Sequence, residues 1–292
     1  MKLGIIGGSG VYDIEGIEHV ESMDISTPFG QPSDCIRFGR LGKLDVYFLP
    51  RHGHSHNLLP SELNHRANIF AFKTLGVHRI LSISAVGSLR EDFKPRDVVF
   101  LDQFFDRTKA SGRHTFFGNG VVAHVPFGDP VCGTLSRELS AAAHRVLARR
   151  DEKGMTIHEG GTYVNMEGPA FSTRAESNVY RKLGFDIIGM TTLAEAKLAR
   201  EAEICYACMG LVTDYDSWHE TKEPVSVEMV VKTLKTTVAF AKETIREFAT
   251  AAKDEDDCTC RHALENAIMT DHAHIPEKIK RDLAPIIGKY VK

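Results

Sequence analysis

The sequence has no apolar run near the roughly 18 residues that a bilayer-spanning helix needs. It also has no charged N-terminal region followed by a long apolar stretch, so we expect neither a membrane anchor nor a secretion signal. An excess of basic residues is missing too, because 36 Lys and Arg stand against 39 Asp and Glu for a net charge of -3. We therefore expect a cytoplasmic protein with no nucleic-acid and no membrane partner, in which any bound anion is held by a local arrangement.

The dense, even cysteine spacing of a small secreted disulfide scaffold is also lacking, since the six cysteines are spread along the chain. We expect most of them to be core thiols. With 292 residues, 42% of them hydrophobic, disorder is excluded and the chain is long enough for one large domain or two modest ones. Histidine is the unusual count at 14, gathered near residues 52–56 and 262–274, which raises the question of a metal site.

Strand-like and helical patterns alternate along the chain. β-rich runs occur at residues 3–6, 44–49, 79–84, 97–101, 162–166, 186–189 and 204–212. Helical patterns occur at residues 64–75, 134–149, 173–183, 194–202 and 227–253. Strands that are apolar nearly throughout favour a sheet covered on both faces. We predict one α/β domain over residues 1–252 and a helical C-terminal extension over 253–292, starting with a charged hinge at 253–257 and packed on the same or a neighbouring subunit.

A glycine turn, Gly7-Gly8-Ser9-Gly10, follows the first predicted strand. Its glycines allow positive φ angles and let backbone N–H groups approach an anion, and the Ser9 hydroxyl lies inside the loop. The spacing matches neither the dinucleotide fingerprint G-x-G-x-x-G nor a P-loop, which needs a Lys after its last glycine. The turn is either purely structural or a contact for a small anion.

The second predicted strand runs into Pro50-Arg51-His52-Gly53-His54-Ser55-His56. The Arg51 guanidinium supplies a planar fork of donors suited to phosphate, and the His52 imidazole can donate another hydrogen bond. Alternatively, the three alternating histidines could face one metal ion, although no acidic or cysteine partner stands at a recognised spacing. Both interpretations stay open on these residues alone.

Small and hydroxylic residues end two further strands. Ser84 and Ala85 follow one of them, and Thr191 follows another at the start of a helix, whose N-terminus favours anions. Ligands of open α/β sheets bind outside the carboxyl ends of the strands. The four strand ends could therefore enclose one phosphate.

Two carboxylates, Asp214 and Asp216, end the apolar run 204–212. In an extended segment, residues two apart point the same way, which places these carboxylates roughly 7 Å apart on one spot. Two acids held close and desolvated tend to split their pKa values, so that one can donate a proton near neutral pH. The alternative is a solvated loop.

Short segments spread in order over residues 3–245 carry a resemblance when they are taken together. They are Gly7-Gly8-Ser9-Gly10, Thr27-Pro28-Phe29-Gly30, Arg51-His52-Gly53, Asn64-His65-Arg66-Ala67-Asn68-Ile69, Glu167-Gly168-Pro169, Phe171-Ser172, Arg174-Ala175-Glu176, Gly189-Met190-Thr191-Thr192 and Thr213-Asp214-Tyr215-Asp216. They closely resemble the trimeric purine nucleoside phosphorylase superfamily, and within it the 5'-methylthioadenosine phosphorylases. The resemblance implies a single domain with a mixed central sheet flanked by helices, and a homotrimer or dimer of trimers.

The same resemblance implies reversible phosphorolysis of 5'-methylthioadenosine, with weaker action on adenosine. Inorganic phosphate is then a co-substrate, and neither a cofactor nor a metal is expected. The implied phosphate ligands are Ser9, Arg51, His52, Ser84, Ala85 and Thr191. The implied nucleoside contacts are Met190, Phe171, Ser172, Asp214, Asp216, Val227 and Val230, with His124 reaching a neighbouring subunit's site. Two alternatives are a phosphorylase for 6-oxopurine nucleosides such as inosine and a non-catalytic nucleoside-binding protein.

The chemistry of phosphorolysis suggests a different role for each of the two carboxylates. Asp214 would protonate N7 of the leaving adenine, and Asp216 would accept a hydrogen bond from its 6-amino group. Gly189 departs from the family pattern, because many relatives carry Asn there beside the base. Cys258-Thr259-Cys260 resembles a pair that is oxidised in heat-stable archaeal relatives, but in a reducing cytoplasm we expect free thiols.

Overall fold

The structure is a computed structural model that describes residues 1–8, 11, 14–109, 114–150, 154–219, 227–252 and 258–291. The strands are β1 (Lys2–Gly7), β2 (Glu18–Met23), β3 (Ile36–Leu41), β4 (Leu44–Pro50), β5 (Arg79–Ser88), β6 (Val98–Phe100), β7 (Gln103–Asp106), β8 (Ile157–Glu159), β9 (Thr162–Asn165), β10 (Ile187–Gly189) and β11 (Cys205–Asp214). The α-helices are α1 (His65–Thr74), α2 (Gly133–Arg149), α3 (Arg174–Lys182), α4 (Thr192–Glu201), α5 (Val227–Ala251), α6 (Glu277–Asp282) and α7 (Ala284–Ile287). Within the described residues, the short 3-10 helices are η1 (Pro60–Glu62), η3 (Thr259–His262) and η4 (His272–His274).

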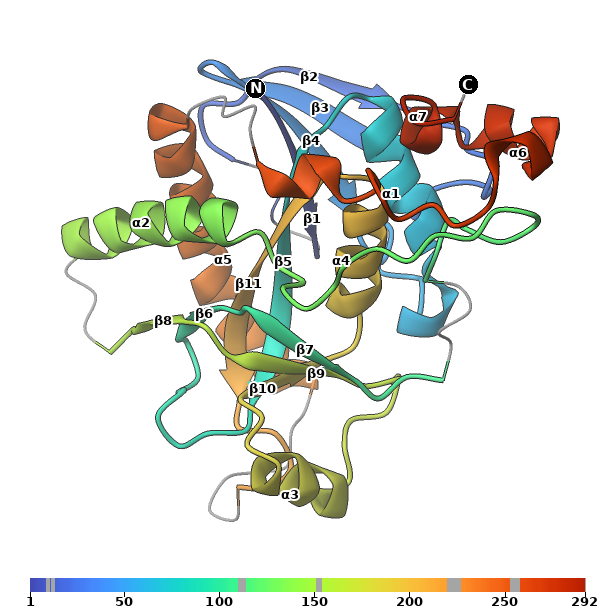
Figure 1. The fold of residues 1–292 in the computed structure, drawn as a ribbon. Coiled ribbons are helices and arrows are strands. Elements are labelled where there is room, and N and C mark those ends of the chain that lie inside the picture. Colours follow the sequence, from blue (N-terminus) through green and yellow to red (C-terminus); the bar gives the residue numbers. More distant parts are fainter. Residues whose placement is uncertain are drawn as a thin grey trace.

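The strands join in one mixed sheet with the order β2-β3-β4-β1-β5-β10-β9-β7, and β11 pairs with both β5 and β6 (Figure 1). Strands β4, β1, β5 and β11 run parallel to one another, whereas β10 is antiparallel to β5. The mixed α/β architecture that the resemblance implies is therefore confirmed.

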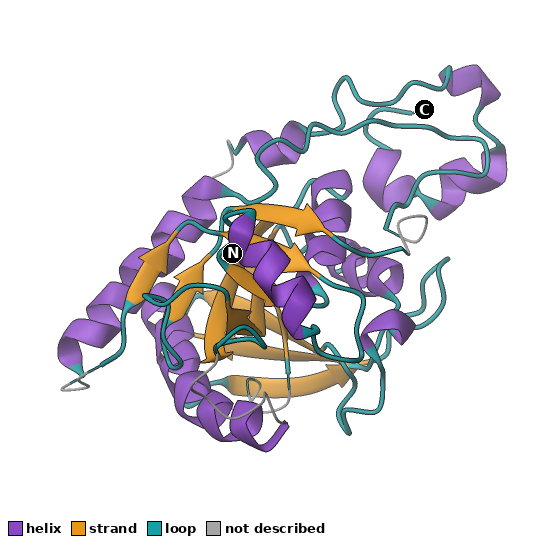
Figure 2. Cartoon of the chain, turned by 90° about the horizontal axis from the view of Figure 1, so that it is seen from below, coloured by secondary structure: helices purple, strands orange, loops and turns teal. Residues whose placement is uncertain are grey.

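Helices cover both faces of the parallel strands. Helices α2 and α5 pack against each other and on β11 from one side, and α1 and α4 pack together on the other (Figures 1 and 2). This cover explains why β11 is buried along its whole length and why its sequence is a continuous apolar run rather than an alternating one.

Parallel strands bring their carboxyl ends to one edge of the sheet. Gly7, the last residue of β1, is paired with Pro50, the last residue of β4, and the Arg51 N–H donates to the Gly7 carbonyl at 2.9 Å. On the other side of β1, the end of β5 lies beside Asp214 at the end of β11. Residues that lie far apart in the sequence therefore meet at this edge.

The sequence prediction locates seven strands and the five longer helices to within a few residues, but misses β2, β3, β7 and β8. Strand β2 is not predicted because five of its six residues are exposed and two of them are glutamates, so no apolar pattern marks it. Strand β8 is only three residues long and pairs with β6 alone. Tertiary pairing, rather than local pattern, makes these segments strands.

The C-terminal extension is described from residue 258 onward, and the predicted charged hinge 253–257 lies outside the described residues. The extension packs at the opposite end of the sheet from the carboxyl ends, since Glu203, two residues before β11, accepts hydrogen bonds from the Leu264 N–H and the Tyr290 hydroxyl. It also forms a β-bridge between Ala123 and Ile268. In Figure 2 it projects to one side of the main body. No helix in the described part of the chain is long and apolar enough to cross a membrane.

Candidate active site

A cavity of about 430 Å³ opens at the carboxyl ends of the parallel strands. The turn after β1, the segment after β4 and the ends of β5, β10 and β11 all contribute to it, so the strand ends that the sequence singles out do meet. The lining residues are Gly8, Val11, Arg51, His52, 56–60, 83–87, Met166, Pro169, Phe171, 188–191, Thr213, Asp214, Asp216, Val230, Leu234 and Val238. A second cavity, also of about 430 Å³, adjoins the first at Pro60 and Met190.

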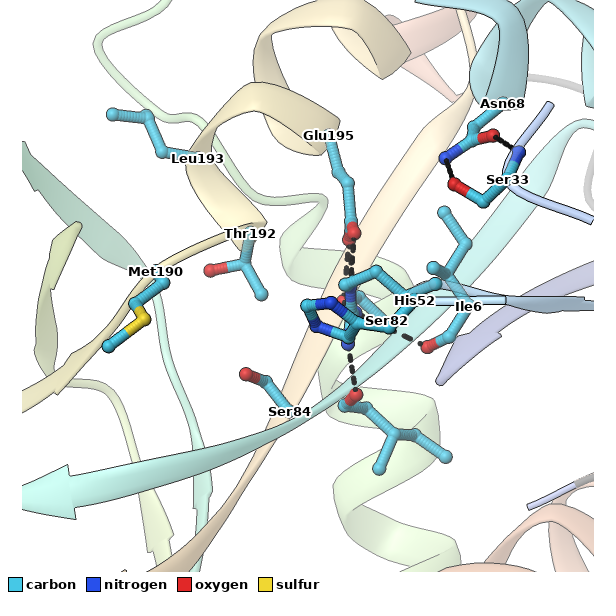
Figure 3. A network of polar contacts seen from close by, with 12 residues as sticks. Ile6, Ser33, His52, Asn68, Ser82, Ser84, Met190, Thr192, Leu193 and Glu195 are labelled. Atoms are coloured by element: carbon cyan, nitrogen blue, oxygen red, sulfur yellow. Dashed lines mark hydrogen bonds and ion pairs between the residues drawn. The ribbon is translucent and has the colours of Figure 1, made fainter. Parts of the chain in front are cut away.

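Arg51 lies buried at one side of the cavity in a network of hydrogen bonds. Its Nε donates to Glu195 Oε1 at 2.6 Å, and its Nη1 donates to the Ile83 carbonyl at 2.9 Å. Its Nη2 donates to Ser82 Oγ at 2.7 Å and also lies near Glu195 Oε2 and the Ile6 carbonyl. Figure 3 shows Glu195 reaching from α4 toward Ser82. Of the five guanidinium hydrogens, these described contacts leave one, on Nη1, for a ligand.

Arg51 and Glu195 form a charged but mutually neutral pair. Burial opposes both charges, yet each partner outweighs it, so the pKa of Arg51 is raised and the pKa of Glu195 is lowered. Sequence reasoning missed Glu195 as a site residue because it stands 144 positions from Arg51. The positive charge that Arg51 brings to the cavity is therefore largely compensated.

His52 presents an acceptor to the cavity rather than the donor that the sequence suggests. Its Nδ1 lies 2.9 Å from the Leu58 carbonyl, which can only accept, so Nδ1 is assigned the ring hydrogen. Burial lowers the pKa of His52 to about 4, so the imidazole is neutral at physiological pH. Its Nε2 consequently carries a lone pair.

Hydroxyl and backbone groups from β5 and α4 complete this side of the cavity. The Ser84 hydroxyl donates to the Ala85 carbonyl at 3.1 Å, which leaves its oxygen free to accept. Thr191, which is 5% exposed and lines the cavity, is the N-cap of α4, but its hydroxyl makes no capping bond. Figure 3 places Ser84, Thr192 and Met190 in the same region. The N-terminus of α4 adds a partial positive charge here.

The two carboxylates lie at the other side of the cavity, at and just beyond the end of β11. They are 5% and 6% exposed for Asp214 and Asp216, so the solvated-loop alternative is wrong. Gly87 of β5 lies against both, since an added Cβ would stand 3.2 Å from Asp214 Oδ1 and 3.3 Å from Asp216 Cβ. A side chain at position 87 would crowd the acids, so glycine permits their placement.

Burial changes the proton affinity of both acids. It raises the pKa of Asp214 to about 6, with a further rise from the Asp216 charge and a partial offset from the Thr213 hydroxyl, which donates at 2.7 Å. Burial also raises the pKa of Asp216, against the nearby Ser177 and Ser172 hydroxyls. Asp216 Oδ2 is buried and accepts no hydrogen bond among the described contacts. The pair thus offers a proton donor near neutral pH and an acceptor without a partner.

An apolar wall closes the cavity on the side of α5. Val230, Leu234 and Val238 recur every four residues along one face of that helix and all line the cavity. Sequence reasoning selected Val230 but missed the other two, although their helical spacing was the signal. Val227, also selected, is 68% exposed and does not belong to the lining.

The structure places some of the remaining predicted site residues at the cavity and others away from it. Phe171 and Met190 line the cavity, whereas Ser172 is buried beside it without reaching the lining. His124 is exposed and lies outside this cavity, and its N–H donates to the Ala267 carbonyl of the C-terminal extension. Ser9 lies outside the described residues.

The surroundings of Gly189 leave no room for the Asn side chain that the family resemblance leads us to expect there. A Cβ at this position would stand 2.0 Å from the hydroxyl oxygen of Tyr163, a fully buried residue of β9. Tyr163 therefore occupies the space that an Asn side chain at position 189 would need.

The histidines near residue 52 do not converge. The rings of His52 and His56 stack with centroids 4.6 Å apart, while His54 Nδ1 faces Arg37 Nη2 at 3.5 Å. In the described residues, the metal-ligating side chains that do converge are four cysteines and no histidine.

Comparisons with known proteins agree with this geometry. A family model described as the phosphorylase superfamily matches residues 2–250. The chain is 54% identical to a Geobacter sulfurreducens protein named S-methyl-5'-thioadenosine phosphorylase, over 99% of both chains. A Koribacter versatilis protein of the same name is 50% identical, over 99% of this chain and 96% of its own.

Solved structures show the same likeness. A methylthioadenosine phosphorylase from an antarctic soil metagenomic library superposes with a TM-score of 0.90 at 44% identity, covering 97% of this chain and 98% of that one. A methylthioadenosine phosphorylase from Schistosoma mansoni in complex with adenine superposes with a TM-score of 0.81 at 35% identity, covering 99% and 98%. In fold, length and sequence, the chain is therefore similar to methylthioadenosine phosphorylases.

Proposed function

This chain belongs to the phosphorylase superfamily, and from that premise we propose how its residues cleave 5'-methylthioadenosine with phosphate. It is a purine nucleoside phosphorylase-class enzyme that converts 5'-methylthioadenosine to adenine and 5-methylthioribose 1-phosphate in a reversible reaction. The two alternatives, a 6-oxopurine phosphorylase and a non-catalytic binding protein, are not favoured by the names of the relatives. The observation that most strongly supports the roles below is the buried pair Asp214 and Asp216 in the cavity that also holds Arg51 and Thr191.

The reaction needs a nucleophile and an acid, and the protein has to supply only the acid. Cleavage of the N-glycosidic bond passes through a ribosyl cation, so a phosphate anion held beneath C1' stabilises the developing charge and then bonds to that carbon. The electrons of the broken bond go to the adenine, which leaves readily when N7 has received a proton. No covalent intermediate with the protein is required.

Phosphate is held mainly by neutral donors in this proposal. The remaining Nη1 hydrogen of Arg51, the Thr191 hydroxyl and the Ala85 N–H donate to it, while Ser84 completes the enclosure. Ser9, which lies outside the described residues, stays a predicted ligand. His52 Nε2 accepts the hydrogen of HPO₄²⁻ instead of donating. Because Glu195 compensates the Arg51 charge, the phosphate keeps enough negative charge to stabilise the ribosyl cation.

The two acids take different roles on the purine. Asp214 in its protonated form donates to N7, which its raised pKa favours. Asp216 Oδ2, without a described partner, accepts from the 6-amino group. Phe171 and Met190 lie against the base and the ribose, with Ser172 supporting Asp216 from behind. A 6-oxo group would face Asp216 acceptor to acceptor, which is costly in a buried site.

The methylthio group faces an apolar wall. Val230, Leu234 and Val238 offer no hydrogen bond to a 5'-hydroxyl, so adenosine is accepted but bound less well. An apolar pocket discriminates such groups by only about 10²-fold. Selection at the base is therefore stronger than selection at the 5' position.

Replacing Asp216 by Asn tests the base assignment and the activity together. Adenine release from 5'-methylthioadenosine is measured with and without phosphate, and inosine is assayed in parallel. In the wild type we expect strict phosphate dependence and a kcat/KM ratio favouring methylthioadenosine by about 10³-fold or more. In Asp216→Asn we expect that ratio to fall by about 10²-fold, because the amide can donate to a 6-oxo group.

Asp24→Asn is the matched control, because Asp24 is exposed and lies outside the cavity. An unchanged ratio in Asp216→Asn would contradict the role of Asp216. Faster turnover of inosine than of methylthioadenosine by the wild type would contradict the activity itself.

We further propose that the enzyme is cytoplasmic and works as a homotrimer or a dimer of trimers, with His124 contributed to a neighbouring subunit's site. Two observations support the shared site. His124 is exposed and lies outside the cavity of its own chain, and nearby Val122 is 49% exposed, so both are accessible to a neighbouring subunit. Val227, at the exposed start of α5, would then meet the methylthio group only in the assembly.

His124→Ala tests the shared site. We expect KM for methylthioadenosine to rise roughly 5- to 10-fold, the effect of one lost hydrogen bond or contact, with Tm unchanged. Light scattering at the assay concentration gives the oligomeric mass. Full activity in a monomeric sample would contradict the shared site.

A further inference from the structure

Four of the six cysteines converge on one point, far from the cavity. The Sγ atoms of Cys132, Cys205, Cys258 and Cys260 all lie within 4.8 Å of one another. They come from three separate segments: Cys132 is the N-cap of α2, Cys205 is the first residue of β11, and the other two stand at the start of η3 in the C-terminal extension. Three are buried and Cys258 is half-buried. We call these four residues the cysteine cluster.

The spacing of the sulfurs fits a shared ligand better than a disulfide. The sulfurs of Cys132 and Cys258 are 3.6 Å apart, whereas a disulfide bond is about 2.05 Å long. Four thiolates placed tetrahedrally around Zn²⁺ at about 2.3 Å have their sulfurs about 3.8 Å apart. None of the six cysteines takes part in a disulfide in this structure.

Simple packing is the competing explanation, because a free cysteine behaves as a small hydrophobic residue. Cys208 illustrates it: it is fully buried in β11, three residues after Cys205, and takes no part in the cluster. Packing alone does not require four sulfurs from three segments to face one another. In a protein that lacks the disulfide pattern of secreted domains, such a set of cysteines is more typical of metal binding.

We propose that the cysteine cluster binds one Zn²⁺ ion as a closed, structural tetrathiolate site. Each thiol that binds loses its proton to solvent, so binding releases up to four protons and transfers no electrons. The thiolate charge has local support, because the Cys132 sulfur accepts from the Leu135 N–H at 3.5 Å at the N-terminus of the 17-residue helix α2.

The ion has a structural rather than a catalytic position. Cys205 and Asp214 are the two ends of β11, and a ten-residue strand places them about 30 Å apart. Four thiolates also leave no open coordination position for a substrate. Two ligands come from the main domain and two from residues 258–291, so the ion fastens the extension to the start of β11. The buried carboxylate of Glu203, two residues before β11, also holds the extension in place, since it accepts hydrogen bonds from Tyr290 and Leu264.

The metal content of the full-length protein tests this proposal directly. The protein is purified without a histidine tag from zinc-containing medium, and its metals are measured by mass spectrometry per mole of chain. We expect about one zinc per chain in the wild type and in Cys35→Ser, whose cysteine lies outside the cluster. The double variant Cys258→Ser/Cys260→Ser is expected to hold less than a tenth of that.

Stability and activity separate a metal site from a packing role. Removing zinc from the wild type with an organomercurial and a chelator is expected to lower Tm by roughly 10 °C, and re-adding Zn²⁺ to restore it. The double variant has the lower Tm from the start and responds to neither treatment. Its kcat at 25 °C stays within about twofold of the wild type, which shows that it folds.

Cobalt gives a reading that packing cannot mimic, because Co²⁺ loaded into the metal-free wild type acquires the strong visible bands of tetrahedral thiolate coordination. The proposal would be overturned if the wild type held no metal and the four thiols of the cysteine cluster were free. It would also be overturned if the wild type were lighter by four hydrogens under non-reducing conditions, because the cluster would then form two disulfides. Zinc that persists in the double variant, or iron in its place in the wild type, would also overturn it.

Discussion

Replacing Asp214 by Asn is expected to lower kcat for 5'-methylthioadenosine by about 10²–10⁴-fold, the usual contribution of a positioned general acid. Asn keeps the shape of the side chain and its hydrogen-bonding capacity, so the adenine still binds and KM changes little. What is lost is the acidic proton for N7, without which adenine has to leave as an anion. Initial rates of adenine release at saturating phosphate measure the effect.

The pH dependence gives the same assignment an independent check. The acid form of Asp214 is the active one, and its pKa is raised to about 6 by burial. Log kcat/KM is therefore expected to fall as the pH rises through that value in the free enzyme. In the substrate complex, the N7 lone pair stabilises the protonated acid, so the corresponding limb of kcat lies at higher pH. Both limbs should vanish in Asp214→Asn.

Loss of folding cannot explain such a result, because the stability effect has the opposite sign. The folded protein binds the Asp214 proton more tightly than the unfolded chain does, so ionising this buried carboxyl above about pH 6 destabilises the fold. Asn removes that cost. Thermal unfolding at pH 8 should thus show a Tm for Asp214→Asn equal to or above that of the wild type. A variant that keeps wild-type kcat, or its alkaline limb, would exclude Asp214 as the acid.

The sequence predicts a site residue correctly where a polar side chain directly follows an apolar run that marks a buried strand. Arg51 and Asp214 follow or end strands that run parallel, which brings those ends to one edge of the sheet. Ser84 lies within β5, which continues to Ser88, and Thr191 follows β10, which is antiparallel to β5. The sheet core was predictable for the same reason, because strands buried on both faces have continuous apolar sequences.

It failed where a residue acquires its role from distant partners. Nothing local in α4 shows that Glu195 meets Arg51, and nothing near Cys132 shows that the C-terminal extension returns to it. The same distance hides the charge of the cavity, because Glu195 compensates the Arg51 charge and burial keeps His52 neutral. Leu234 and Val238 are a different kind of miss, since their spacing from Val230 was visible in the sequence.

Glu195→Ala is expected to lower the free energy of unfolding by about 3–5 kcal/mol, because it leaves the Arg51 charge buried without its partner. The side chains of the pair are 4% and 1% exposed, so water cannot replace the lost carboxylate easily. The Ser82 and Tyr206 hydroxyls also lose the Glu195 Oε2 acceptor, at 2.7 Å and 3.0 Å. For a chain of this size, thermal unfolding should show a Tm lower by roughly 10 °C.

Two comparisons show whether the loss comes from the stranded charge. Breaking the exposed pair between Arg246 and Glu15 with Arg246→Ala should cost less than about 1 kcal/mol, because solvent screens that interaction. In Arg51→Met/Glu195→Leu, the charge and its partner are both replaced by apolar side chains, so most of the lost Tm should return. The double variant should nevertheless be nearly inactive with a much weaker response to phosphate, because the last free guanidinium hydrogen is gone. Recovery of Tm without recovery of activity would separate the two roles of Arg51, whereas a double variant as unstable as Glu195→Ala would mean that packing around α4, and not the buried charge, sets the stability.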